Sequence, residues 1–199
     1  MTLHSVAAAY PESPTSSERD LMFTFLDMFR DTITCPHCKE HFTGVLENYR
    51  RQFPGMLQSR HEFMMFTFRA HNAVNRRLNK PLQLTVEDCL KTLQNNVKTR
   101  SARDYRTAYY NHIARHWSVM RDVSGIVASK KIRELRKIDV DYVNSRDTNF
   151  QIQLKSDVTV LPRDALDKDP QDIQTNPFVL PRTEVRAGFR FTSKGIRLR

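Results

Sequence analysis

Apolar residues in the first half of the chain recur at steps of three and four, which is the period of an amphipathic helix. One such run has an apolar face made by Leu21, Phe25, Met28 and Phe29. The residues before it, SPTSSE at 13–18, include hydroxyl and acidic side chains that are typical of a helix start. We therefore predict a helix that begins soon after Pro14.

Three further helices are predicted before residue 95. The first begins at Thr34, whose hydroxyl is able to cap it, and has Pro36 in its first turn. The second runs from about residue 59 to 78 and has an apolar stripe of Phe63, Phe66, Ala70, Val74 and Leu78. A short third helix covers about 86–94. Together these elements predict a compact all-α unit.

The second half of the chain changes its pattern twice. A helix is predicted from Ala102 to Val123, with Ser124-Gly125 interrupting it before a basic helical stretch, SKKIRELRKI. From Phe150 to Val160 apolar and polar residues alternate, which is a weak β-hairpin signal. We divide the chain into a helical domain at 1–98, a helical and partly irregular or β extension at 99–161, and a Pro- and Asp-rich linker with a basic tail at 162–199.

Composition favours a soluble globular protein. Hydrophobic residues make up 39% and charged residues 27% of the 199 residues, and no apolar run is long enough to span a membrane. The start, MTLHSVAAAYP, lacks the basic region of a secretory signal, so we expect the cytosol or a similar compartment.

Positive charge is concentrated in the second half of the chain. Residues 1–100 have 13 Lys and Arg against 10 Asp and Glu, a net +3, whereas residues 101–199 have 19 against 12, a net +7. Such an excess is compatible with nucleic acid, an anionic membrane or an acidic partner, and equally with an ordinary solvated surface.

The candidate chemistry lies in CPHC at 35–38. A cysteine at a helix amino terminus has a lowered pKa, because unpaired N–H groups and the helix dipole stabilise its thiolate. Cys38 lies one turn after Cys35, so the pair is able to form a disulfide and act as a redox dithiol. The same residues with His41 and a distant His61 or His71 are also able to hold zinc. The cysteine spacing alone leaves both interpretations open.

A second motif, HNAVNRRLNK at 71–80, lies on the predicted helix that ends near Leu78. His71 and Asn75 are four residues apart and therefore share one helix face. We expect this face to point inward, where each polar group needs a partner because an unpaired buried polar group is costly. A satisfied network within the core is the simpler alternative.

These two motifs resemble the signature of the Erv/ALR family of FAD-linked sulfhydryl oxidases, in which a CxxC precedes HNxVNxxLxK. In this chain CPHC and HNAVNRRLNK are about 30 residues apart, as in the family. The opening TLHSVAAAYP also resembles the family's LH…YP segment, with His4 and Tyr10 in the matching places. The resemblance covers roughly residues 2–94.

The resemblance implies a bundle of four helices plus a short fifth, with FAD at the end of the bundle. Cys35 would exchange disulfides with the incoming thiols, and Cys38 would contact the flavin as a thiolate. Substrate dithiol would reduce the Cys35–Cys38 disulfide, and the electrons would pass through FAD to dioxygen to give hydrogen peroxide. The FAD site would be lined by His71, Asn72, Val74, Asn75, Leu78 and Lys80, together with Cys38, His4, Tyr10 and His41.

The sequence departs from the family pattern in three respects. The structural disulfide of many members is missing, because its matching positions are Phe68 and Thr85, and Phe66 stands where a tryptophan is usual. Since Cys89 is single, the chain also lacks a second pair to shuttle electrons, and Cys89 itself is best interpreted as an ordinary partly buried cysteine.

The resemblance also suggests partners and a location. Without a shuttle, the expected substrate is a partner dithiol, such as a thioredoxin-like or CxxC protein. This minimal design resembles the oxidases of large DNA viruses, which predicts host cytoplasm or the virion, and a homodimer is expected by analogy. The tail with Phe189 and Phe191 is compatible with nucleic acid or a virion component, although a solvated tail is the simpler interpretation.

Two other classes remain as alternatives. A zinc-binding interaction or nucleic-acid-binding protein would use the cysteines and histidines as ligands. A non-catalytic relic would keep the fold without binding flavin. The block at 71–80 argues against both, because neither needs those residue types at that spacing.

Overall fold

A computed structural model of the chain describes residues 1–120, 123–158 and 160. Its α-helices are α1 Thr2–Ala8, α2 Ser16–Asp31, α3 Pro36–Gln52, α4 Arg60–Arg77, α5 Val86–Asn96, α6 Ala102–Ser118 and α7 Val123–Ile138, followed by the short turns η1 Asp139–Val143 and η2 Asn144–Arg146. The all-α prediction is confirmed, since no β-strand forms among these residues. None of the helices in the described ranges is both long and apolar enough to span a bilayer.

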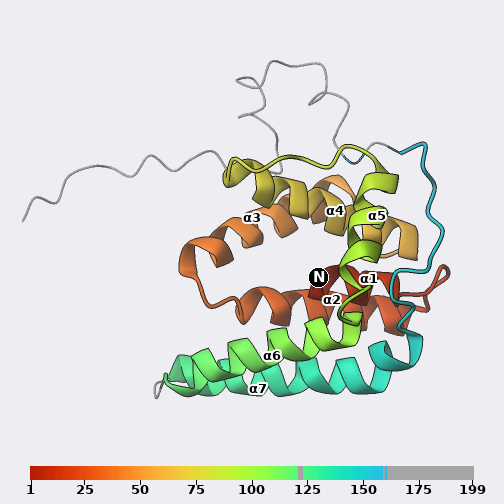
Figure 1. The fold of residues 1–199 in the computed structure, drawn as a ribbon. Helices are drawn as coiled ribbons and strands as arrows, with labels where there is room; N and C mark the ends of the chain where they lie inside the picture. The colour runs from red at the N-terminus through yellow and green to blue at the C-terminus, as the bar shows by residue number, and fades with distance from the viewer. Residues whose placement is uncertain (121–122, 159, 161–199) are drawn as a thin grey trace, which may run out of the picture.

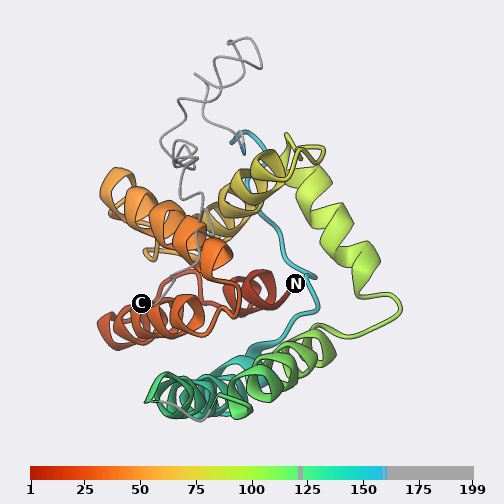
Figure 2. The same cartoon turned by 90° about the vertical axis from the view of Figure 1, so that its left-hand side faces the viewer.

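The helices are arranged in layers (Figure 1). α3 and α4 form one layer, α1 and α2 lie in the middle, and α6 with α7 forms an antiparallel pair on the other side of α2, as the turned view also shows (Figure 2). α5 connects the outer layers at one end of the molecule. The short α1 is therefore enclosed, because it packs against both α4 and α6.

Side-chain caps begin the helices where the sequence predicted helix starts. At α2, the Thr15 hydroxyl accepts from Glu18 N–H while the Glu18 carboxylate accepts from Thr15 N–H, so that two unpaired donors are satisfied together. Ser59, Thr85 and Ser101 cap α4, α5 and α6 in the same way, each by accepting a backbone N–H from three residues later.

Aromatic side chains form the centre of the core. Tyr10, Tyr49, Phe63 and Phe66 are fully buried. The rings of Tyr10 and Phe63 meet edge to face at 5.4 Å, and those of Tyr49 and Phe66 meet at 4.9 Å. Burying each large apolar side chain stabilises the fold by about 1.5–3 kcal/mol. These contacts fix α1 and α3 against α4.

The helices after residue 98 share this core. Ile113, Ile132 and Leu135 belong to the same buried cluster as the residues of α1 to α5. Polar contacts hold the extension to α2 and the turn after it. Trp117 Nε1 donates to the Thr32 carbonyl at 3.0 Å, and Lys131 pairs with Asp31. Glu18 accepts from the Tyr142 hydroxyl at 2.9 Å and pairs with Arg146 at 3.0 Å. The extension therefore covers the outer face of α2.

A buried arginine ties the extension together. Arg106 on α6 is 0% exposed and pairs with Asp139 at 2.5 Å and Asp147 at 2.6 Å. Its third nitrogen donates to Asn144 Oδ1 at 2.8 Å. Burial raises the pKa of Asp139, whereas Arg106 lowers it. A buried charge is tolerated only when it is paired and hydrogen-bonded, so these residues depend on one another.

The predicted helix break at Ser124-Gly125 is wrong, because both residues lie in the first turn of α7. The chain leaves α6 earlier, after Ser118. Gly125 is needed for a different reason: a Cβ there would lie 2.0 Å from the Met120 carbonyl oxygen. The glycine thus allows α7 to start close against the end of α6.

The predicted β-hairpin from Phe150 is also wrong for the described residues. This segment runs back along the molecule from the α6–α7 layer towards α5 (Figure 1), where Phe150 O accepts from Gln94 Nε2 at 3.1 Å. Its alternating Ile152, Leu154 and Val158 pack against the core. An extended segment with one side on the core shows the same period as a strand, but no second strand pairs with it in the described part of the chain. The predicted linker and tail at 162–199 lie outside the described residues.

The Arg106 network generates the first prediction. Arg106→Ala leaves the buried Asp139 carboxylate unpaired, so the free energy of unfolding should fall by about 3–5 kcal/mol, measured by denaturant unfolding followed by circular dichroism. Arg115→Ala is the matched control, since Arg115 is exposed on the same helix, and a loss below about 0.5 kcal/mol is expected there. Equal losses in the two variants would contradict a special role for Arg106.

Candidate active site

Cys35 and Cys38 lie at the amino terminus of α3, and both are exposed. Cys35 is the capping residue, Pro36 is the first helical residue, and Cys35 Sγ accepts the Cys38 N–H at 3.3 Å. The sulfur thus takes the capping position that we predicted for the Thr34 hydroxyl. The predicted placement of the pair at a helix start is confirmed.

The two thiols have opposite pKa shifts. Hydrogen bonds from the Cys38 side chain and N–H lower the pKa of Cys35, and the nearby Arg77 adds to this effect. The pKa of Cys38 is raised, chiefly because its side chain is hydrogen-bonded to Cys35. In the reduced pair, Cys35 is therefore the first to ionise and the more nucleophilic thiol.

Arg77 is a residue of this site that the sequence analysis missed. It lies in the last turn of α4, and its Nη1 donates to the His37 carbonyl at 3.1 Å. Its charge favours the thiolate form of both Cys35 and Cys38. No spacing pattern relates Arg77 to residues about 40 positions earlier, so only the packing of α3 against α4 reveals it.

His41 extends the site along α3, one turn after Cys38. The residue is 6% exposed, and its Nε2 has no hydrogen-bond partner among the described residues. Burial lowers its pKa, and Arg77 acts in the same direction. A buried nitrogen of this kind is satisfied by water or by a bound molecule, so His41 is a candidate ligand contact at this site.

His4 on α1 joins two residues of α4. His4 Nδ1 lies 2.9 Å from Thr67 Oγ1, and His4 Nε2 lies 3.2 Å from His71 Nδ1. Burial lowers the pKa of both histidines. Thr67 was not predicted as a site residue, although it lies four residues before His71 and therefore on the same helix face.

Asn72 and Asn75 of the 71–80 motif brace the chain after α4. Buried Asn72 pairs with the backbone of Gln83, accepting its N–H at 3.0 Å and donating to its carbonyl at 2.6 Å. Asn75 Nδ2 donates to the Pro81 carbonyl at 3.1 Å. We expected His71 and Asn75 to point inward, but His71 is largely exposed, with its ring partly covered where it meets His4, and the buried polar residue of the motif is Asn72.

The remaining predicted site residues lie in different environments. Tyr10 is fully enclosed by the core, and its hydroxyl donates to the Leu57 carbonyl at 3.0 Å. Val74 is half-buried, whereas Leu78 and Lys80 are exposed after the end of α4. Leu78 therefore lies outside the buried stripe on which its spacing placed it. The structure does not bring Tyr10 to the surface.

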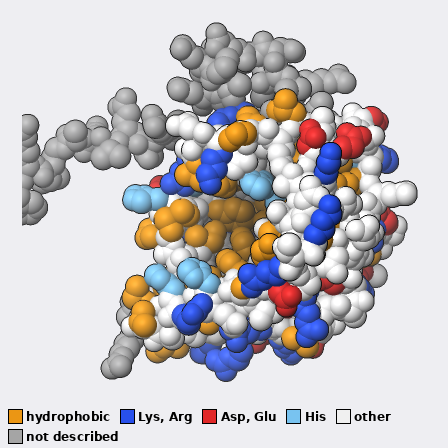
Figure 3. All heavy atoms as spheres, viewed as in Figure 1, with side chains coloured by type: hydrophobic (Ala, Val, Ile, Leu, Met, Phe, Trp, Pro, Cys, Tyr) orange, Lys and Arg blue, Asp and Glu red, His pale blue; other side chains and the backbone are white. Residues whose placement is uncertain are grey.

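The face of the molecule in front of α1 is hollowed between the α3–α4 layer and α2 (Figure 3). Hydrophobic side chains form the floor of this hollow, and histidine side chains lie around it. An apolar concave surface with a few polar groups is typical of a cofactor site.

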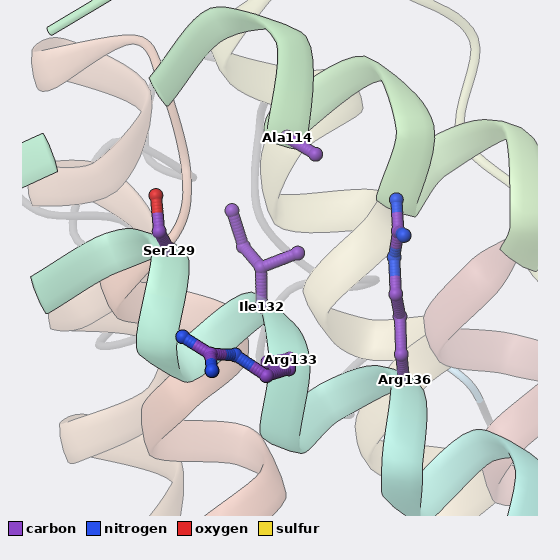
Figure 4. Close-up of a pocket in the computed structure, with 5 residues that line it drawn as sticks. All are labelled: Ala114, Ser129, Ile132, Arg133 and Arg136. Carbon is purple, nitrogen blue, oxygen red and sulfur yellow. The ribbon is translucent and has the colours of Figure 1, made fainter. Parts of the chain in front are cut away.

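A separate pocket lies between α6 and α7 (Figure 4). It is lined by Ala114, Ser129, Ile132, Arg133 and Arg136, with a volume of about 220 Å³. Arg136 is already engaged there, since its Nη2 donates to Asn111 Oδ1 at 2.9 Å. This pocket contains no cysteine or histidine, so it is separate from the thiol pair.

The zinc interpretation needs a third and a fourth ligand near the cysteines. Within the described residues, no group of three or more His, Cys, Asp or Glu side chains is placed to hold a metal ion. Neither His61 nor His71 completes such a cluster with the cysteine pair, so the geometry does not support the zinc alternative.

Comparison with known proteins agrees with the resemblance that the two sequence motifs indicate. The sequence model of the Erv1/Alr family matches residues 1–100, half of the chain. The mitochondrial FAD-linked sulfhydryl oxidase ERV1 of Saccharomyces cerevisiae is 39% identical over 79 residues, 40% of each chain. The FAD-linked sulfhydryl oxidase ERV2 of the same yeast is 31% identical over 91 residues, 46% of this chain and 42% of ERV2.

A viral relative is similar over a longer stretch. The protein described as "Probable FAD-linked sulfhydryl oxidase R368" of Acanthamoeba polyphaga mimivirus is 26% identical over 131 residues, 66% of this chain and 90% of that protein. The matched part of this chain covers less than half of the two yeast relatives. No solved structure matches the chain.

The thiol pKa shifts predict an order of reactivity. In the reduced protein, iodoacetamide should modify Cys35 first, with a pH midpoint below that of an ordinary cysteine, because the thiolate is the reacting form. Cys38 should follow, and Cys89 should be protected, since burial raises its pKa to about 12. Peptide mass spectrometry across a pH series measures all three. In Arg77→Gln the midpoint for Cys35 should rise, and modification of Cys38 before Cys35 would contradict the assignment.

The Asn72 contacts predict a loss of stability. Asn72→Ala removes two hydrogen bonds and leaves part of the Gln83 backbone without its partner, so the free energy of unfolding should fall by about 1–3 kcal/mol. Asn95→Ala, at an exposed position on α5, should change it by less than about 0.5 kcal/mol. Denaturant unfolding of both variants tests the brace, and a silent Asn72→Ala would refute it.

Proposed function

Because the chain belongs to the Erv1/Alr family, we propose that it is an FAD-dependent sulfhydryl oxidase that converts protein dithiols to disulfides through Cys35 and Cys38. The observation that carries the proposal is the exposed cysteine pair at the start of α3, whose first thiol has a lowered pKa. Family membership supports the same chemistry, since the relatives that match are described as FAD-linked sulfhydryl oxidases.

The residues around the pair fit a flavin cofactor. His41 offers a buried nitrogen without a partner one turn from Cys38, and the hollow in front of α1 has an apolar floor (Figure 3). We propose that His41, His71 and Cys38 would contact FAD. Asn72 and Asn75 would support the site indirectly, because their amides hold the segment after α4. Tyr10 would support the cofactor site only indirectly, because its ring is fully enclosed in the hydrophobic core.

The first chemical step takes place at Cys35. A substrate thiolate attacks Sγ of Cys35 in the Cys35–Cys38 disulfide, so a new substrate–Cys35 disulfide forms and Cys38 leaves as a thiolate. Cys35 is suited to this role because it is exposed. The second substrate thiolate then attacks the substrate sulfur of the mixed disulfide and releases Cys35. A thiol of low pKa is a better leaving group, so the lowered pKa of Cys35 favours this second step.

Arg77 favours Cys38 as a thiolate during the exchange. The main cause that raises the pKa of Cys38 is its hydrogen bond with Cys35, followed by burial. Once Cys35 is bound to the substrate, the first cause is gone, while burial still raises the pKa of Cys38 and Arg77 still lowers it. Arg77 is therefore expected to hold the negative charge at Cys38 until the electrons leave the dithiol.

FAD, when bound, would act as a two-electron oxidant of the dithiol and would pass the electrons on to dioxygen. The overall reaction balances as two thiols and one dioxygen giving one disulfide and one hydrogen peroxide, with both thiol protons ending on the peroxide. The protein's part is to position the reactive disulfide and to set the ionisation of its two sulfurs.

The partner, assembly and location remain predictions. A thioredoxin-like or CxxC protein is the expected substrate, and host cytoplasm or a virion is the expected location. The predicted homodimer would have to use a surface other than the face of α2 that α7 covers.

The proposal predicts a visible spectrum that responds to thiols. Purified protein should show the absorbance of oxidised flavin, which should bleach with a dithiol under nitrogen and return in air. A colourless protein that also fails to take up added FAD would refute the proposal.

The role of Cys35 predicts a separation of flavin binding from turnover. Cys35→Ser should keep the bound flavin but lose at least about two orders of magnitude in dithiol oxidation, because the covalent route is removed. Oxygen consumption with a dithiol substrate measures this rate. Cys89→Ser is the control, since Cys89 is a buried single thiol on α5 rather than part of the exposed pair, and it should retain the activity. Full activity of Cys35→Ser would overturn the assignment of the redox pair.

A further inference from the structure

The hydrogen bonds between α1 and α4 form a chain of four groups: the Met64 carbonyl, the Thr67 hydroxyl, and the rings of His4 and His71. We propose that Thr67 fixes the tautomers of both histidines, so that His71 presents a hydrogen-bond acceptor at Nε2 to the bound cofactor. The cofactor part of this inference rests on the proposed function. Thr67 is thus a positioning residue, since it acts on the ligand only through the two rings.

The direction of donation along this series of hydrogen bonds is set at the buried Thr67 end. Thr67 Oγ1 lies 2.8 Å from the Met64 carbonyl oxygen. A carbonyl oxygen only accepts, so two oxygens at this distance need a hydrogen between them, and that hydrogen comes from the Thr67 hydroxyl. Because a hydroxyl has a single proton, Thr67 has only lone pairs left for its other neighbour, His4.

His4 must then donate to Thr67. Its Nδ1 lies 2.9 Å from Thr67 Oγ1 in a buried position, so Nδ1 has to be protonated. Burial lowers the pKa of His4 well below its ordinary value, which keeps the ring neutral. In a neutral ring with its proton on Nδ1, the other nitrogen is an acceptor, so His4 Nε2 accepts from His71.

The same argument applies to His71. Its Nδ1 lies 3.2 Å from His4 Nε2 and must donate to it. Burial also lowers the pKa of His71, so the ring is neutral near pH 7 and its Nε2 has no proton. Nothing in the described part of the chain hydrogen-bonds to this nitrogen. A ligand group that meets it therefore has to be a donor, such as an N–H or hydroxyl of the flavin cofactor.

If the hydrogen bonds ran in the opposite direction, His71 would bind an acceptor group of the ligand instead of a donor group. If Thr67 donated to His4, both histidines would have their protons on Nε2, and His71 would present a donor. That arrangement leaves two oxygens 2.8 Å apart without a hydrogen between them, which is unfavourable. One hydroxyl on α4 thereby decides which kind of cofactor group His71 binds.

Nuclear magnetic resonance of the flavin-free protein tests the inference. With ¹⁵N-labelled histidine, the nitrogen shifts and long-range proton couplings show which ring nitrogen has the proton. We expect Nδ1–H at both His4 and His71 in the wild type and in Thr67→Ser, which keeps the hydroxyl. In Thr67→Val, which keeps the shape but has no acceptor, both rings should change towards Nε2–H.

FAD affinity is the second measurement. The dissociation constant, followed by flavin fluorescence, should rise about 10-fold in Thr67→Val, which corresponds to about one hydrogen bond. It should stay within about twofold of the wild type in Thr67→Ser. Because the wild-type spectrum alone shows the tautomers, the test does not depend on the folding of the valine variant.

The outcomes separate this inference from the proposed function. Nε2–H rings in a wild-type protein that binds FAD would overturn the inference alone. Unchanged tautomers in Thr67→Val, or equal loss of affinity in the serine and valine variants, would also overturn it. A wild-type protein that does not bind FAD would overturn both the inference and the proposed function.

Discussion

The packing of α3 against α4 is the constraint on which the candidate active site depends. It brings the last turn of α4 to the first turn of α3, so that Arg77 donates to the His37 carbonyl and lies near both sulfurs. The same contact places His41 under the influence of Arg77. Helix termini therefore supply both the position of the thiols and the charge that stabilises their reactive form.

The extension after residue 98 is part of the same folded body. Its helices share the hydrophobic core with α1 to α5, and its polar contacts reach α2 and Thr32. The buried charge of Arg106 holds α6 to the turns after α7. The part of the chain that matches the Erv1/Alr family is thus joined here to a second layer of helices that covers α2. The similarity of the mimiviral relative over 131 residues extends beyond the family match at 1–100 into this layer.

Much of the fold was predictable because its signals are local. The period of apolar residues, the capping groups and the prolines place α2 to α5 within a few residues, and the cysteine spacing together with the 71–80 motif points to the candidate site. What the sequence could not show is set by contacts between distant segments. Arg77 and Thr67 have no pattern that relates them to Cys35 or His4, and the extended segment after Phe150 has the period of a strand without a partner. The break between α6 and α7 was misplaced because Gly125 serves a close approach rather than a turn.

The brace made by Asn72 and Gln83 has a chemical consequence. Many members of the family, as the resemblance implies, join this part of the chain with a disulfide, but here Phe68 and Thr85 occupy the matching positions. An amide pair is inert to thiols, whereas a disulfide near a centre that exchanges disulfides is open to the same attack. The proposed thiol–disulfide exchange would therefore leave this brace intact, and the contact between α4 and the segment after it does not depend on the redox state of the surroundings.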